Sequence, residues 1–181
     1  MEVDDIIVAH MGPPDIVGID VGKKGGICVG KNKPSAIPLP LTKSGLVDVN
    51  LIIGYIFEVT GGVDFVLYIE DVHAMPKQGV VSMFNFGKGF GQLISLGQLI
   101  AREWTTVTPQ TWKKQVLNGY DVRDKKAAID YVKKKYKMDL VPKRCRKEHD
   151  GMADAVCIWE YGKNIYDMMN GDKVCQSEQL N

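Results

Sequence analysis

Short apolar runs bounded by turn residues alternate along the chain with stretches in which apolar residues recur at helical spacing. The apolar runs predict strands at residues 16–22, 25–31, 34–38, 65–69 and 104–107. The helical spacing predicts helices at residues 45–59, 84–100, 109–117, 124–136 and 149–166. A glycine-rich turn joins the first two strands into a hairpin, and prolines confine the third strand to a sheet edge.

The order of these elements determines the expected fold class. Three strands come first, then strands and helices alternate, and three helices close the chain. This order favours α/β, with a mixed central β-sheet flanked by α-helices. The length of 181 residues fits one domain. We expect that domain at residues 15–168, with a flexible lead-in at 1–14 and a polar C-terminal tail at 169–181.

Composition is that of an ordinary globular protein, with 45% hydrophobic and 25% charged residues. No apolar run reaches the roughly 18 residues that span a bilayer, so no membrane partner is expected. The cysteines form no Cys-x-x-Cys pair, which argues against a zinc site and a disulfide framework. The N-terminus is acidic, unlike a secretory signal. We therefore expect a cytoplasmic protein, in the host cytoplasm if a phage or virus encodes it.

Positive charge gathers in one part of the chain, although the formal net charge is only +1. Residues 123–147 are rich in Lys and Arg, and only Asp124, Asp130 and Asp139 oppose them there. Such a run is often the solvated face of a helix. It can also be the electrostatic footprint of a nucleic-acid site, and the sequence leaves both interpretations open.

Two of the predicted strands end in a carboxylate. Asp20 closes the first apolar run, and Glu70 follows the buried run at 65–69. Ligand sites in open α/β sheets gather at such strand ends, so the two acids come close if their strands are neighbours. Paired carboxylates repel each other, and a divalent cation resolves that conflict. Alternatively, each acid caps a turn or faces solvent at the start of a loop.

A second pair of acids opens the last predicted helix. Asp150 and Asp154 are four residues apart and share one helical face. The alanines on either side of Asp154 let the helix approach the sheet closely. Alternatively, both acids only complement the positive end of the helix dipole. His149 is a metal ligand, a positioned base or a residue that starts the helix.

These acids come from separate segments, and few nitrogen ligands accompany them. Oxygen ligands of this kind suit Mg²⁺ or Mn²⁺ rather than zinc. Oxygen-lined sites that hold two such cations perform in-line displacement at phosphorus. The nearby basic stretch would then hold a phosphate backbone.

The segment after Glu70 is also unusual. Its glycines at 87, 89 and 91 do not follow the dinucleotide-binding spacing Gly-x-Gly-x-x-Gly, because residue 92 is Gln. Glycines that open a helix permit close packing or the close approach of a phosphate. His73 lies in the loop next to the candidate site, where a residue that stacks on a base or wedges between bases would be useful.

The chain resembles the RuvC-type Holliday-junction resolvases of the ribonuclease-H-like superfamily. The motifs that carry this resemblance are Ile16–Asp20, Tyr68–Val72 and Ala153–Val156. Other stretches are similar to the phage and viral branch of that family, namely Met75–Gly79, Phe86–Gly91, Val107–Lys114 and His149–Asp154. The resemblance covers roughly residues 16 to 162.

The resemblance implies a ribonuclease-H-like fold and a Mg²⁺-dependent endonuclease. The implied acidic tetrad, which binds two Mg²⁺ ions that Mn²⁺ can replace, is Asp20, Glu70, Asp150 and Asp154. The implied activity is the paired nicking of a four-way DNA junction by a homodimer, and other branched DNA is a possible substrate. Lys113 and Lys125 match phosphate-contacting lysines of the family. The further DNA-binding candidates, from the segment after Glu70, are His73, Lys77 and Lys88.

The chain departs from the family pattern at two positions. Bacterial members commonly space their last two acids i, i+3, whereas here residue 151 is Gly and the acid is Asp150. They also often carry Phe where this chain has His73. The first departure concerns the role of Asp150, and the second concerns the stacking role of His73.

Two other functions remain to be separated from the nuclease. One is a junction-binding module without catalysis, although retention of all four acids argues against it. The other is an actin-like nucleotide phosphotransferase, because Asp20-x-Gly22-x-x-Gly25 loosely resembles a phosphate loop. A second phosphate loop and the longer chain of that superfamily are both missing from this sequence.

Overall fold

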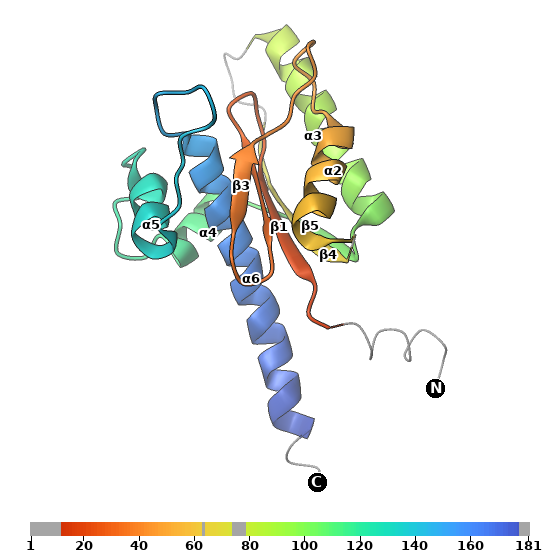
Figure 1. Ribbon diagram of the computed structural model, residues 1–181, viewed down its shortest axis with the longest axis vertical. Coiled ribbons are helices and arrows are strands. Elements are labelled where there is room, and N and C mark those ends of the chain that lie inside the picture. Colours follow the sequence, from red (N-terminus) through yellow and green to blue (C-terminus); the bar gives the residue numbers. More distant parts are fainter. Residues whose placement is uncertain (1–11, 63, 74–78, 178–181) are drawn as a thin grey trace.

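A five-stranded mixed sheet forms the centre of the molecule (Figure 1). The structure is a computed structural model and describes residues 12–62, 64–73 and 79–177. The strands are β1 (Asp15–Asp20), β2 (Gly26–Gly30), β3 (Ser35–Pro38), β4 (Phe65–Glu70) and β5 (Glu103–Val107). Their order across the sheet is β3-β2-β1-β4-β5. The first three strands pair antiparallel, and β4 and β5 run parallel to β1, so the α/β class is confirmed.

Helices cover both faces of this sheet. They are α2 (Val49–Thr60), α3 (Val80–Ile100), α4 (Pro109–Val116), α5 (Ala127–Tyr136) and α6 (Asp150–Ser177). Figure 1 shows α2 and α3 on one side of the sheet and α4, α5 and α6 on the other. Within the described ranges, none of these helices is both long and apolar enough to cross a membrane.

The alternation of side chains along β1 and β4 divides the core into two layers. Val17 and Ile19 of β1 pack with Leu67 and Ile69 of β4 under α2 and α3. Ile16 belongs to the layer under α4, α5 and α6, as do Val66 and Tyr68 of β4. The next residues in this second series are Asp20 and Glu70. The strand period therefore places both acids on the face that α6 covers.

Glycines let α6 lie close to the sheet. A Cβ atom at Gly18 of β1 would approach the backbone nitrogen of Trp159 to 2.4 Å. A Cβ atom at Gly26 would approach the carbonyl oxygen of Gly151 to 2.3 Å. Ala153 and Ala155 are fully buried at the same contact. The first turns of α6 thus pack directly on the β1–β2 hairpin, which brings Asp154 toward the end of β1.

The observed elements match the predicted ones in kind and order, with differences at their ends. Helix α2 begins at Val49, where the Asp48 side chain accepts a hydrogen bond from the amide of Leu51, rather than at 45. Helix α3 begins at Val80 rather than 84, and α5 at Ala127 rather than 124. Helix α6 continues to Ser177, beyond the predicted end at 166. The predicted lead-in lies mostly outside the described residues.

Candidate active site

Asp20 and Glu70 lie side by side at one edge of the sheet. They end the neighbouring parallel strands β1 and β4, where Ile19 pairs with Ile69 in the register. Both side chains face α6, and they share a hydrogen bond. The condition that these strands are neighbours is therefore met, and the acids come together as a direct result of the parallel pairing.

The surroundings of Asp20 raise the pKa of its carboxyl group. Burial is the largest cause that raises the pKa of Asp20, to about 10, and the charge of Glu70 and the hydrogen bond to it come next. The charges of Asp154 and Asp150 raise the pKa further. All four predicted acids therefore lie within electrostatic reach of one another, and at neutral pH Asp20 holds a proton in the absence of a compensating positive charge.

Glu70 is the most enclosed of the four acids, with an exposed fraction of 8%. Its Oε1 accepts a hydrogen bond of 3.1 Å from Nε1 of Trp112. Trp112 is fully buried in α4, whose first turn is capped by the Thr108 side chain, which accepts from the amide of Thr111. Trp112 is a site residue to which the sequence reasoning gave no role. The only signal was its position in the stretch Val107–Lys114, which carried the resemblance.

The start of α6 supplies the other two acids. Nδ1 of His149 accepts a hydrogen bond of 3.2 Å from the amide of Met152, so His149 is the residue that starts the helix, as one of the three interpretations held. Asp150 is exposed, and its Oδ1 accepts a hydrogen bond of 3.1 Å from the amide of Gly151. A Cβ atom at residue 151 would lie 1.9 Å from the carbonyl oxygen of Lys24. A carboxylate spaced i, i+3 from Asp154 therefore has no room here.

Asp154 faces the pair from β1 and β4. Burial is the main cause that raises the pKa of Asp154, to about 6, and the charges of Glu70 and Asp150 raise it as well. The Lys113 ammonium opposes this shift. Lys113 is half-buried on α4, with its Nζ 5.2 Å from the centre of the Trp112 ring. This predicted DNA-contacting lysine thus lies beside the carboxylates.

The chemistry of these side chains suits a hard divalent cation. All four are carboxylates, and the mutual repulsion that raises the pKa of Asp20 is what a cation would relieve. Among the residues that the structure describes, however, no three His, Cys, Asp or Glu side chains converge closely enough to form a metal cage. The four acids lie near one another, but their side chains are not arranged around a single metal position.

The other predicted DNA contacts lie at varying distances from the acids. His73 is exposed just after β4, with its Nε2 3.7 Å from Oδ2 of Asp71. Lys125 is exposed in the segment before α5. Lys88 lies over the ring of Phe84 at 4.2 Å and lines the groove between α2 and α3, so it is not brought to the acids. Lys77 lies outside the described residues.

Part of the basic stretch holds the fold together. Nζ of Lys133 lies 2.5 Å from a carboxylate oxygen of Glu148. Lys135 pairs with Glu160 of α6, which is only 3% exposed and also accepts a hydrogen bond from the Tyr131 hydroxyl. These two lysines are therefore engaged within the protein. The segment 121–126, which includes Lys125, is exposed.

The glycine-rich turn between β1 and β2 has a packing role. A Cβ atom at Gly25 would lie 2.1 Å from the carbonyl oxygen of Asp20. Gly26 contacts the backbone of Gly151 in the same way. Because the close turn and the contact with α6 account for these glycines, no phosphate loop is needed to explain them.

No protein-family model and no curated protein matches the chain. Among solved structures, RuvC of T. thermophilus in complex with a Holliday junction substrate aligns with a TM-score of 0.52 and 10% identity, covering 87% of this chain and 96% of that chain. The yeast mitochondrial Holliday junction resolvase Ydc2 aligns with a TM-score of 0.51 and 13% identity, covering 93% of this chain and 92% of that chain. The predicted ribonuclease-H-like fold is therefore confirmed.

Proposed function

We propose that this protein is a metal-dependent endonuclease that resolves four-way DNA junctions by paired nicks. The observation that carries the proposal is the meeting of Asp20, Glu70 and Asp154 on one face of the sheet edge, with Asp150 within electrostatic reach. The likeness of fold to two Holliday junction resolvases supports the choice of substrate. Paired nicks need two sites, so the proposal includes a homodimer.

The four carboxylates would hold the divalent cations, Mg²⁺ in the first place and Mn²⁺ as a substitute. Cations held there would supply Lewis-acid activation of a water and charge stabilisation for a leaving 3′ oxygen. The protein's own part is to position the ligands. Trp112 fixes Glu70 by its hydrogen bond, and the close packing of α6 holds Asp154 opposite β1.

Two lysines would act on the DNA backbone. Lys113 lies beside Asp154, so its ammonium is suited to binding a phosphate next to the cleaved one. Lys125 lies in the exposed segment 121–126, where it would contact a phosphate farther along an arm. His73 is exposed next to Asp71, three residues after Glu70, and is suited to stacking on a base at the branch point.

The test is a nicking assay on a synthetic four-way junction with Mg²⁺, in parallel with three-way, flap and linear duplex DNA. Asp20→Asn and Asp154→Asn remove metal-ligand charge, so we expect nicking to fall by about a thousandfold or more while junction binding persists. Asp167→Asn is the matched control, because Asp167 is exposed on α6 and pairs with Lys163. Light scattering of the protein alone tests the dimer.

Three results would contradict the proposal or a part of it. Undiminished nicking by both site variants would remove the role of the carboxylates. Junction binding by the wild type without any nicking under Mg²⁺ or Mn²⁺ would favour the binding module. Equal cleavage of junction and linear DNA would keep the nuclease but refute its selectivity.

A further inference from the structure

Residues 141–148 form a closed loop directly before α6, which we call the cationic loop. The amide of His149 donates a hydrogen bond of 2.9 Å to the carbonyl oxygen of Leu140, so the two ends of the loop are joined. Within the loop, the amide of Cys145 donates to the carbonyl oxygen of Pro142 at 2.9 Å. Figure 1 shows the loop beyond the first turn of α6, on the side where α5 lies. The backbone therefore presents this segment to solvent as one closed turn.

The charge of the cationic loop is almost entirely positive. Its only acid, Glu148, pairs with Lys133 of α5 at 2.5 Å. Its four cations are exposed, and among the residues that the structure describes none of them pairs with a carboxylate; they are Lys143, Arg144, Arg146 and Lys147. Segment 121–126, by comparison, has three cations against two acids. The cationic loop therefore holds more unopposed positive charge than the segment to which Lys125 belongs.

The loop lies close to the carboxylates because the chain runs from it directly into them. Lys147 is three residues before Asp150, and consecutive Cα atoms are about 3.8 Å apart, so the two Cα atoms are at most about 11 Å apart. Each strand of duplex DNA carries one phosphate for about every 3.4 Å of helix axis. The loop is therefore at the distance of phosphates that lie a few nucleotides from one held at the acids.

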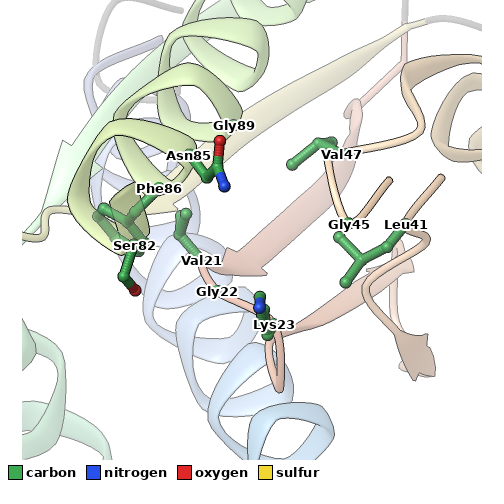
Figure 2. Close-up of a pocket in the computed structure, with 10 residues that line it drawn as sticks. All are labelled: Val21, Gly22, Lys23, Leu41, Gly45, Val47, Ser82, Asn85, Phe86 and Gly89. Atoms are coloured by element: carbon green, nitrogen blue, oxygen red, sulfur yellow. The ribbon is translucent and has the colours of Figure 1, made fainter. Parts of the chain in front are cut away.

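The β1–β2 turn adds one more cation to this surface. Burial is the largest cause that lowers the pKa of the His149 imidazole, and the charge of Lys24 lowers it further. Lys24 thus lies at the start of α6, where its carbonyl also contacts Gly151. Lys23, in contrast, lines a cavity of about 240 Å³ in the layer of α2 and α3 (Figure 2). Two adjacent exposed lysines therefore lie on different surfaces, which makes them a matched pair for experiments.

We propose that the cationic loop and Lys24 bind the backbone of a duplex arm, a few nucleotides from the cleaved phosphate, and supply the largest share of the electrostatic affinity for DNA. The ligand is the sugar–phosphate backbone rather than a base, because the loop offers Lys and Arg side chains and has no aromatic ring on which a base could stack. A closed loop also loses less conformational freedom on binding than an open segment does. The inference rests on the proposed function, since the acids determine which phosphate is cut.

The first experiment measures how many phosphates the loop binds. Junction binding is followed in EDTA at several salt concentrations with Lys143→Gln, Arg146→Gln and Lys147→Gln combined in one variant. Arg144 is retained, because its φ of 67° is a left-handed conformation that a substitution could disturb. Each lost phosphate contact lowers the slope of log K against log salt by about 0.9, so we expect a fall of about 2–3.

A matched variant loses the same number of charges at other places, through Lys31→Gln, Lys33→Gln and Lys163→Gln. Lys31 and Lys33 follow β2 at the end of the sheet opposite the acids, because Gly30 pairs with Ile16 whereas Gly26 pairs with Asp20. This variant should keep the wild-type slope. Lys24→Gln should lower the slope by about 1, whereas Lys23→Gln should leave it unchanged. Unfolding curves establish that each variant folds.

The second experiment locates the DNA from within the loop. Cys145 is exposed whereas Cys28 and Cys157 are buried, so a photoactivatable aryl azide attaches at Cys145 in a Cys175→Ser background. Irradiation of the complex with a four-way junction in EDTA should cross-link the loop to a short run of nucleotides within about ten of the crossover. The control carries the reagent at Glu58→Cys with Cys145→Ser and Cys175→Ser. It should give no cross-link, since Glu58 is exposed on α2, on the other side of the sheet.

The outcomes separate this proposal from the nuclease itself. If the wild type nicks junctions, the loop variant keeps the wild-type slope and Cys145 gives no cross-link, the loop proposal is overturned and the nuclease stands. An equal fall of the slope in the matched variant would also overturn it, because net charge alone would then explain the effect. If the slope falls only in the loop variant, the cross-link forms and no protein nicks, binding by the loop is supported and the nuclease is refuted.

Discussion

Trp112 links the core under α4 to the carboxylate edge of the sheet. Its ring is fully buried, and its Nε1 donates a hydrogen bond to Oε1 of Glu70. A hydrogen bond to a charged acceptor contributes about 1.5–3 kcal/mol, more than one between neutral groups. Trp112 therefore acts as a positioning residue, which holds Glu70 in one orientation beside Asp20.

Trp112→Phe keeps most of the buried apolar surface and removes the donor. We expect nicking at saturating junction to fall by about tenfold and the Mg²⁺ concentration for half-maximal nicking to rise, because Glu70 is no longer held. The measurement is a Mg²⁺ titration of the nicking rate. Trp104→Phe on β5 is the control. Trp104 packs against Gly97 in the core layer under α2 and α3, whereas the carboxylates face α6. An unchanged Mg²⁺ curve in Trp112→Phe would show that Glu70 needs no such support.

The raised pKa of Asp154 predicts a dependence of stability on pH. Its pKa is about 6 in the folded protein against an ordinary value of 3.8, so the folded state binds the proton more tightly. The stability that this group contributes is complete below pH 3.8 and is lost as the pH rises through about 6. Without divalent cations, the melting temperature should therefore fall between about pH 4 and pH 7.

Asp154→Asn isolates this contribution. In EDTA at pH 7 we expect the variant to melt about 3–6 °C higher than the wild type and to show a flatter pH dependence, because the buried charge is gone. Scanning calorimetry from pH 4 to pH 8 measures both. Asp167→Asn should follow the wild-type curve. A variant less stable than the wild type at pH 7 would show that the charged form of Asp154 is stabilised rather than strained.

At the scale of elements, the contact between α6 and the β1–β2 hairpin determines where two of the four acids lie. The contact is backbone on backbone, and Gly151 sits against the carbonyl of Lys24. There is no flexible side chain here that could move aside. Asp150 and Asp154 can therefore lie where they do only because Gly151, between them, has no side chain.

Gly151→Ala tests this contact. Its Cβ atom would lie 1.9 Å from the Lys24 carbonyl oxygen, so the helix must shift away from the hairpin. We expect the free energy of unfolding to fall by about 2–3 kcal/mol and nicking to be lost, as measured by denaturant unfolding and the junction assay. Gly54→Ala on α2 is the matched control: no atom lies within 4 Å of its Cβ position, and the change should stabilise by about 0.5–1 kcal/mol. Equal stability of the two variants would contradict the close contact.

Periodicity and turn residues predicted the elements well, because the two core layers follow strict local patterns. Their ends were predicted less well. Helix α3 begins with Val80 and Val81, which are 85% and 74% exposed, and no side chain caps it, so no local signal marks its start. The acids at the ends of β1 and β4, in contrast, could be found from the sequence. The bond from Trp112 to Glu70 could not, because it depends on how α4 packs after β5.

At the scale of the whole molecule, the basic stretch serves two purposes. Lys135 pairs with the buried Glu160 of α6, and Lys133 pairs with Glu148, so these charges are engaged within the protein. The exposed segment 121–126 carries charge that can meet a DNA backbone. A count of lysines in the sequence therefore overstates the charge available to a ligand.

Salt dependence of junction binding measures that available charge. We expect the dissociation constant to rise steeply with salt, and Lys125→Ala to reduce the slope of log K against log salt by about 1, because one phosphate contact is lost. Binding in EDTA at several salt concentrations gives the slope. Lys163→Ala is the control, since this lysine pairs with Asp167 on the far part of α6. An unchanged slope in Lys125→Ala would place segment 121–126 away from the DNA.

The acidic edge joins the first strand of the sheet to the last helix of the chain. Asp20 and Glu70 lie on β1 and β4, whereas Asp150 and Asp154 emerge from the ribosome only after the five strands that the structure describes have been made. A nascent chain can therefore form its sheet before all four acids have been synthesised. On the proposed function, the order of translation itself keeps an activity that could damage DNA silent until the start of α6 has been made.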